Sequence, residues 1–156
     1  MNAQFDPPNI EYKGFSKINC LGLIISGIED EMLFSEIEKL FFSIGDETLS
    51  KQVTLGSFTE CPLYPLSVQF FIKQNKDGTF SGTIGVAVEA TSESTTIEVK
   101  YPSVDEENWY YQVGFMPIIE DKKILSNSDN TYILSQTKIL MQRVLDQLAL
   151  YWIEYP

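Results

Sequence analysis

The stretch from residue 66 to residue 88 constrains the fold more than any other part of the chain. Apolar side chains occupy every second position between residues 66 and 72, which is the period expected of a half-buried strand. Segment 75–79, Asn-Lys-Asp-Gly-Thr, then supplies the Asp-Gly pair that tight hairpin turns favour, and a second alternating run follows. These residues predict an antiparallel β-hairpin.

Further strands are predicted on both sides of this hairpin. Short apolar or alternating runs indicate them in segments 10–26, 51–58, 96–101 and 109–116, the last closed by Pro117. Short connections between successive strands favour an antiparallel β-meander of about four to six strands. Segment 120–130 is rich in charged and small polar residues and is expected to be a loop.

Two helices are predicted beside this sheet. A helix spans residues 30–44, where apolar residues recur on one face and Gly45 follows as the expected residue after the last turn. A longer C-terminal helix runs from about residue 131 to about residue 151, with Asp129 or Ser128 as its N-cap. Its apolar face is wider than packing on one sheet requires, so it either crosses a curved sheet or meets another subunit in a homodimer.

The resulting fold class is α+β, with both helices packed on one face of the sheet. A chain of 156 residues can bury a sufficient core as one domain. Residues 1–9 contain a Pro-Pro pair and no periodicity, which indicates a flexible N-terminal arm. Residues 10–156 are therefore expected to form a single α+β domain.

The net charge is the most unusual feature of the composition. Twenty-two acidic residues against eleven basic ones, with no histidine, give a formal net charge of −11. Such a charge repels nucleic acid and anionic membranes and attracts basic proteins. We therefore expect a basic protein partner, no direct nucleic-acid binding and no membrane association.

The two cysteines, Cys20 and Cys61, each lie in a largely apolar run and are expected to be buried thiols. Two cysteines do not form a disulfide framework. The sequence has no recognisable signal peptide, and its apolar runs are too short to span a bilayer. The expected compartment is the cytoplasm.

The sequence carries no catalytic signature. Its lack of histidine removes Ser-His and Cys-His nucleophile pairs and the commonest transition-metal ligand. Ser135 and Lys138 match a Ser-x-x-Lys pattern, but the Ser-Asp-Asn motif at 128–130 precedes it and a Lys-Thr-Gly motif is missing. A pair of carboxylates acting as acid and base is the remaining enzymatic alternative. We expect no enzyme activity, no catalytic residue, no metal and no cofactor.

The segment Asp-Glu-Glu-Asn-Trp-Tyr-Tyr at 105–111 sets three acids against three aromatics. Alternation predicts Trp109 and Tyr111 on the core face of a strand and the intervening residues on the opposite face. Exposed aromatic and Met side chains beside acids suit a protein interface. The candidate partner-binding residues are therefore Asp105, Glu106, Glu107, Tyr110, Gln112 and Met116.

These features favour an acidic, non-enzymatic protein-binding protein. The leading hypothesis is an immunity or inhibitor protein that neutralises a basic toxin or nuclease, because steered association and a few aromatic anchors can block a cationic cleft. The alternative is a cytoplasmic chaperone or adaptor for a secreted substrate protein, working through an apolar groove. A nucleic-acid mimic is not distinguished from an inhibitor at this level.

Overall fold

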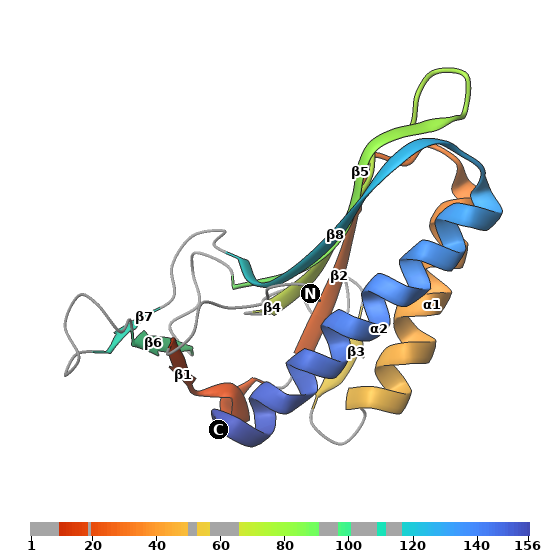
Figure 1. Cartoon of the computed structure of the whole chain (residues 1–156). Helices are drawn as coiled ribbons and strands as arrows, with labels where there is room; N and C mark the ends of the chain where they lie inside the picture. The colour runs from red at the N-terminus through yellow and green to blue at the C-terminus, as the bar shows by residue number, and fades with distance from the viewer. Residues whose placement is uncertain are drawn as a thin grey trace.

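A computed structural model gives the structure of the chain (Figure 1). It describes residues 10–18, 20–49, 53–56, 66–90, 97–100, 109–111 and 117–156, with the backbone alone for residues 110 and 111. The predicted arm, residues 1–9, lies outside the described residues.

A five-stranded sheet forms the centre of the molecule. Its strands are β2 (Cys20–Ser26), β3 (Thr54–Gly56), β4 (Leu66–Phe71), β5 (Phe80–Ala90) and β8 (Pro117–Ser128). They lie in the order β3-β2-β4-β5-β8. The helices α1 (Glu31–Leu49) and α2 (Asn130–Glu154) lie side by side on the same face of this sheet (Figure 1). The α+β class is confirmed.

The core lies between the sheet and the two helices. Alternating side chains of the two central strands point into it and are inaccessible to solvent, namely Leu66, Val68, Phe70, Ile84, Val86 and Val88. Buried side chains of both helices close it from the other side, among them Leu33, Ile37, Phe41, Ile133, Leu140, Val144 and Leu148. Burial of this apolar surface is the main stabilising contribution to the fold.

The predicted hairpin is present. Strands β4 and β5 pair antiparallel with Val68 opposite Val88. The turn between them uses Gly78 at a φ of +87°, a conformation that favours glycine. The Asp77 carboxylate accepts hydrogen bonds from both the backbone N–H and the hydroxyl of Thr79, at 3.0 and 2.6 Å, and so fixes the turn.

Of the predicted antiparallel meander, the five-stranded sheet contains only the antiparallel pairs β4–β5 and β5–β8, and β8 is not the strand that follows β5 in the sequence. Strand β2 runs parallel to both of its neighbours, β3 and β4, so the sheet is mixed. The reason is the helix that follows β2. Helix α1 carries the chain from the end of β2 back to the level at which β2 began. The next strand, β3, therefore runs in the same direction as β2.

Segment 120–130, expected to be a loop, is mostly strand. Strand β8 begins at Pro117, which was expected to end a strand, and continues through Ser128. Among the described strands it pairs with β5 alone, and there it forms an edge of the sheet. Edge strands tolerate a proline at their first position and favour lysines that discourage further pairing, as Lys122 and Lys123 do here.

Both helices are longer than predicted. Helix α1 begins one residue after the expected start and continues to Leu49. Gly45, expected beyond the end of the helix, lies inside it. A side chain at position 45 would overlap the Leu55 side chain of β3, which explains why this helical position is a glycine. Helix α2 has Asp129 as its N-cap, as predicted, with the backbone N–H of Tyr132 donating to the Asp129 carboxylate at 2.8 Å.

A second, smaller sheet lies beside the C-terminal end of α2 (Figure 1). It contains β1 (Glu11–Lys13), β6 (Glu98–Lys100) and β7 (Tyr110–Tyr111), in the order β1-β6-β7. A short 3-10 helix, η1 (Phe15–Lys17), follows β1. Aromatic rings connect this region to α2: Tyr12 stacks on Tyr151 at 5.5 Å, and Phe15 meets Trp152 edge-on at 5.3 Å.

The prediction that Cys20 is a free thiol was wrong. The residue is disulfide-bonded. The sequence contains one other cysteine, Cys61, which lies outside the described residues. Within the described ranges, neither helix has the length and apolar character needed to cross a lipid bilayer.

Candidate partner-binding surface

The structure describes little of the predicted partner-binding segment. Asp105, Glu106, Glu107, Gln112 and Met116 all lie outside the described residues. The backbone of Tyr110 belongs to β7 and pairs with Val99 of β6. The role predicted for these residues therefore stays a prediction.

Trp109 lies next to β7 and is half-buried, although alternation predicted it on a core face. The ammonium groups of Lys13 and Lys100 lie 4.4 and 5.3 Å from the centre of its ring, within cation–π range. The same ammonium groups form ion pairs with Glu98 at 3.7 Å and with Glu11 at 3.3 Å. The outer side of the small sheet thus carries paired charges of both signs.

The unpaired negative charge concentrates on α1 and the turn before it. Residues 29–49 hold seven of the chain's 22 acidic residues and one of its 11 basic residues, a net charge of −6 out of −11. Lys39, that single base, pairs with Glu36 at 3.3 Å. The other acidic side chains of this segment form no ion pair with a described residue. We call residues 29–49 the acidic segment.

The sequence dictates which way these charges point. Leu33, Ile37, Phe41 and Ile44 form the buried stripe of α1, so the opposite side of the helix faces solvent. The exposed residues of α1 are Glu31, Met32, Phe34, Glu36, Lys39, Ser43, Asp46 and Glu47. Met32 is 78% exposed and Phe34 is 38% exposed, and both provide apolar surface near the start of the helix. An acidic rim with an apolar anchor matches the composition of a partner-binding surface.

Asp30 fixes the start of the acidic segment. Its carboxylate accepts hydrogen bonds from the backbone N–H groups of Met32 at 2.9 Å and Leu33 at 3.2 Å, and from the Asn130 amide of α2 at 3.3 Å. The hydrogen bond from Leu33, followed by that from Asn130, lowers the pKa of Asp30 below its ordinary value. The N-terminal ends of both helices are thereby held together.

A shallow pocket of about 340 Å³ lies next to this end of α1. Its lining residues are Gly27, Ile28, Glu29, Ile72, Lys73 and Gln74. The backbone N–H of Gln74 donates to the Gly27 carbonyl, and the Gln74 side chain accepts from the N–H of Glu29. A side chain at Gly27 would overlap the Ile72 carbonyl, so the close approach of the two walls requires glycine. The pocket is therefore lined in part by the first residue of the acidic segment, the exposed Glu29.

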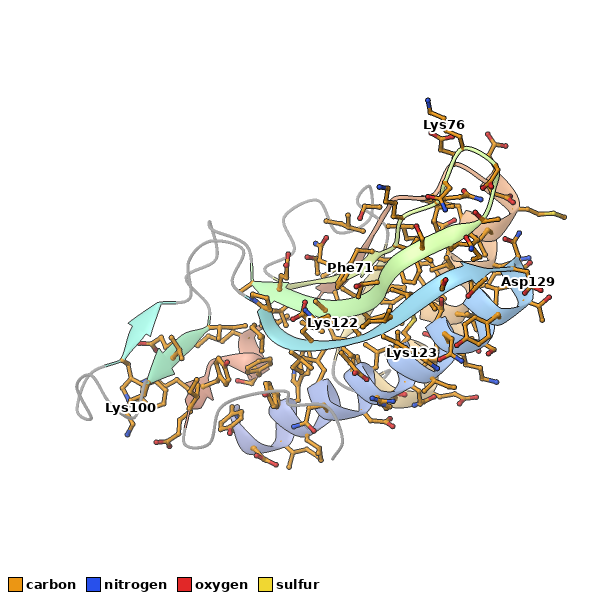
Figure 2. The ribbon with its side chains drawn as sticks, turned by 45° about the horizontal axis from the view of Figure 1, so that its top comes forward. Phe71, Lys76, Lys100, Lys122, Lys123 and Asp129 are labelled. Atoms are coloured by element: carbon orange, nitrogen blue, oxygen red, sulfur yellow. The ribbon has the colours of Figure 1, made fainter. Side chains whose placement is uncertain are left out.

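The face of the sheet opposite the helices carries a different set of groups. The Phe71 ring lies over Gly85 of the neighbouring strand (Figure 2). Lys122, in register with Gly85, extends the same row onto β8. Partial burial, with the negative charge of Glu120 adding to it, raises the pKa of Glu89 above its ordinary value. Glu89 and Glu120 are thus two carboxylates that influence each other, the feature that an acid–base pair of carboxylates requires.

The motif weighed for serine chemistry lies on α2. Ser135 and Lys138 are both exposed on that helix, away from the pocket and from the core. Among the residues that the structure describes, no cluster of three or more Cys, Asp or Glu side chains is placed to hold a metal ion.

Neither protein-family models nor curated proteins contain a match to the chain. Among solved structures, it is similar to two structures of the PelC dodecamer from Paraburkholderia phytofirmans. The first, a single-residue variant, has a TM-score of 0.42 and 13% identity, covering 90% of this chain and 98% of that one. The second has a TM-score of 0.39 and 14% identity over 90% and 96%. Likeness at this level assigns neither function nor assembly.

Proposed function

We propose that this chain is a non-enzymatic protein-binding protein of the immunity or inhibitor type, which neutralises a basic partner such as a toxin or nuclease. The observation that carries the proposal is the net charge of −6 on residues 29–49, which comprise α1 and the turn before it and include the exposed carboxylates of Glu29, Glu31, Glu36, Asp46 and Glu47. Helix α1 packs on the core through Leu33, Ile37, Phe41 and Ile44, so its exposed carboxylates are presented from a folded helix backbone.

Two physical effects favour binding at the acidic segment. Unpaired carboxylates on one face raise the local concentration of a basic protein and accelerate association. Exposed apolar surface at Met32, which is 78% exposed, can then be buried in the contact near the start of α1. Asp105, Glu106, Glu107 and Tyr110 stay proposed as further contacts of the same partner.

The disulfide bears on the compartment in which this binding takes place. Disulfides persist in oxidising compartments and are rare in the reducing cytoplasm. The bond at Cys20 therefore favours a working compartment outside the cytoplasm, in contrast to the expectation from the sequence. We propose that the protein meets its basic partner in such a compartment.

A chaperone or adaptor for a secreted substrate is the second candidate. The observation in its favour is the set of apolar side chains that α2 exposes, namely Tyr132, Ile139, Leu150 and Ile153. This candidate requires binding of an unfolded segment through apolar contacts that tolerate salt. The inhibitor candidate requires a folded, basic partner whose association weakens with salt.

Capture from an extract of the native host tests the proposal. Tagged protein is incubated at roughly 50 and 300 mM salt, which spans weak to strong screening of exposed charges, and retained proteins are identified by mass spectrometry. Two charge-reversal variants are compared: Asp46→Lys with Glu47→Lys on α1, and Glu120→Lys with Glu154→Lys elsewhere. Both change the net charge equally.

The expected result is one stoichiometric basic protein, retained at low salt, lost with the α1 variant and kept with the control variant. Equal retention by the two variants would contradict the placement of the site on α1. A salt-resistant unfolded substrate would favour the chaperone candidate instead.

A further inference from the structure

The solvent side of α2 carries a regular seam whose apolar members are not explained by packing of the core. Two of its polar members, Gln136 and Arg143, contact β8 through Lys123 and Asp121. Six residues of the seam are spaced alternately by three and four positions: Gln136, Ile139, Arg143, Asp146, Leu150 and Ile153. This 3-4 spacing is the heptad pattern by which one helix packs along another. The buried stripe of α2, which includes Leu140, Val144 and Leu148, lies on the other side of the helix.

The apolar side chains of the seam are largely exposed to solvent. Ile139, Leu150 and Ile153 are 47%, 44% and 69% exposed. Scattered exposed apolar residues need no explanation, but these three recur along one line of the helix. That line extends for roughly 25 Å at the rise of an α-helix, enough for a helix–helix contact.

The seam is complementary to itself when a second α2 lies antiparallel to it. In antiparallel pairs, each a position of one helix opposes a d position of the other. In the register centred between Arg143 and Asp146, Ile139 opposes Leu150, and Leu150 opposes Ile139. Arg143 then opposes Asp146 in both directions. A two-fold axis requires this kind of reciprocity between the two surfaces.

Charge also favours this side of the molecule for self-association. Two copies of a chain with a net charge of −11 repel each other, and this repulsion is weakest when their contact lies away from the acidic residues. Residues 117–156, which form β8 and α2, hold five acidic and four basic residues, a net charge of −1. The acidic segment on α1 holds −6 by comparison. A second copy therefore meets little repulsion along α2.

We propose that α2 pairs with α2 of a second copy of this chain through this seam, antiparallel, with Ile139 against Leu150 and Arg143 against Asp146. Arg143 already pairs with the buried carboxylate of Asp121 of its own chain at 2.7 Å, which holds the guanidinium in place at the seam. The pairing leaves the acidic segment free for its partner and does not depend on the proposed function.

Sedimentation of the full chain tests the proposal, at concentrations between roughly 1 and 100 µM, the range of weak to moderate dimers. Two double variants are prepared: Ile139→Lys with Leu150→Lys, and Ile139→Glu with Leu150→Glu. Each is expected to be monomeric alone, because like charges oppose each other at both contacts, and their mixture is expected to form a heterodimer. Lys138→Glu, an exposed α2 position outside the seam, serves as the control and should leave the dimer intact.

The expected effect of each double variant is a dissociation constant at least about tenfold higher than that of the unmodified chain. Circular dichroism confirms that the variants keep the fold, as substitution of exposed positions should. A monomeric unmodified chain across the concentration range would overturn the proposal. So would a dimer that persists in both variants, or two monomeric variants that fail to associate when mixed.

Discussion

The Phe71 ring on β4 lies over Gly85 of β5, and the two residues are directly opposite in the antiparallel ladder. A side chain at position 85 would occupy the space of the phenyl ring, so the glycine is what admits the aromatic ring to this face. An aromatic ring that covers a glycine on a neighbouring strand replaces the packing that the glycine lacks.

Gly85→Ala should lower the free energy of unfolding by about 1–3 kcal/mol, as overpacking at a well-packed site does. Urea unfolding of four proteins checks this: the unmodified chain, Gly85→Ala, Phe71→Ala and the double variant. In the Phe71→Ala background the cost of Gly85→Ala should largely disappear, because the ring is no longer displaced. Equal cost in both backgrounds would contradict the contact.

Reduction of the disulfide at Cys20 should lower the free energy of unfolding by about 2–4 kcal/mol, through greater freedom of the unfolded chain. Thermal unfolding with and without dithiothreitol measures the change. The Cys20→Ser variant should have the lower stability in both conditions and should not respond to the reductant. Unchanged stability on reduction would show that the bond does not constrain the fold.

Glu89 should make the protein less stable as the pH rises. Its folded pKa is raised above the ordinary 4.5, so the folded state binds the proton more tightly than the unfolded state does. The resulting destabilisation is absent below the unfolded pKa and develops as the pH rises through the folded pKa. Glu89→Gln should therefore raise the melting temperature at pH 7 by roughly 1–2 °C, since solvent screens this half-exposed carboxylate. The gain should vanish near pH 4, measured by calorimetry, and a gain independent of pH would contradict this cause.

Asp30 should have the opposite pH dependence. Its folded pKa is below the ordinary 3.8, so its contribution is present above the unfolded pKa and is lost as the pH falls through the folded pKa. Asp30→Ala should lower the melting temperature at pH 7, because three donors lose their acceptor, and this loss should shrink as the pH falls below 3.8. Asp30→Asn keeps a side-chain oxygen that can accept from the helix N–H groups but has no charge. Its melting temperature at pH 7 should lie between those of the unmodified chain and Asp30→Ala.

Sequence patterns predicted the parts of the fold that depend on local chemistry. The alternation around Val68 and the Asp77–Gly78 turn are sufficient to specify the hairpin, since both act between neighbouring residues. The N-cap at Asp129 was readable for the same reason. The parallel pairing of β2 was not, because a short apolar run does not indicate the direction of its neighbours.

Burial explains the remaining differences. Strand β8 lies at an edge, so its exposed Lys122 and Lys123 made it look like a loop. Gly45 was read as a helix end because its contact with Leu55 is distant in sequence. The seven acids within residues 29–49 can be counted in the sequence, but only the structure shows which of them are exposed, because exposure depends on how α1 packs on the core.

A binding surface on α1 is tested most sharply by the association rate of the captured basic partner. It is measured at roughly 50 to 300 mM salt for the unmodified chain, the α1 variant Asp46→Lys with Glu47→Lys, and the control Glu120→Lys with Glu154→Lys. We expect the association rate of the unmodified chain to fall about tenfold or more across this range of salt. The α1 variant should associate much more slowly, at a rate that is nearly independent of salt. The control should keep most of the rate and most of its salt dependence. Equal losses in the two variants would show that net charge alone governs association and would contradict a binding surface on α1.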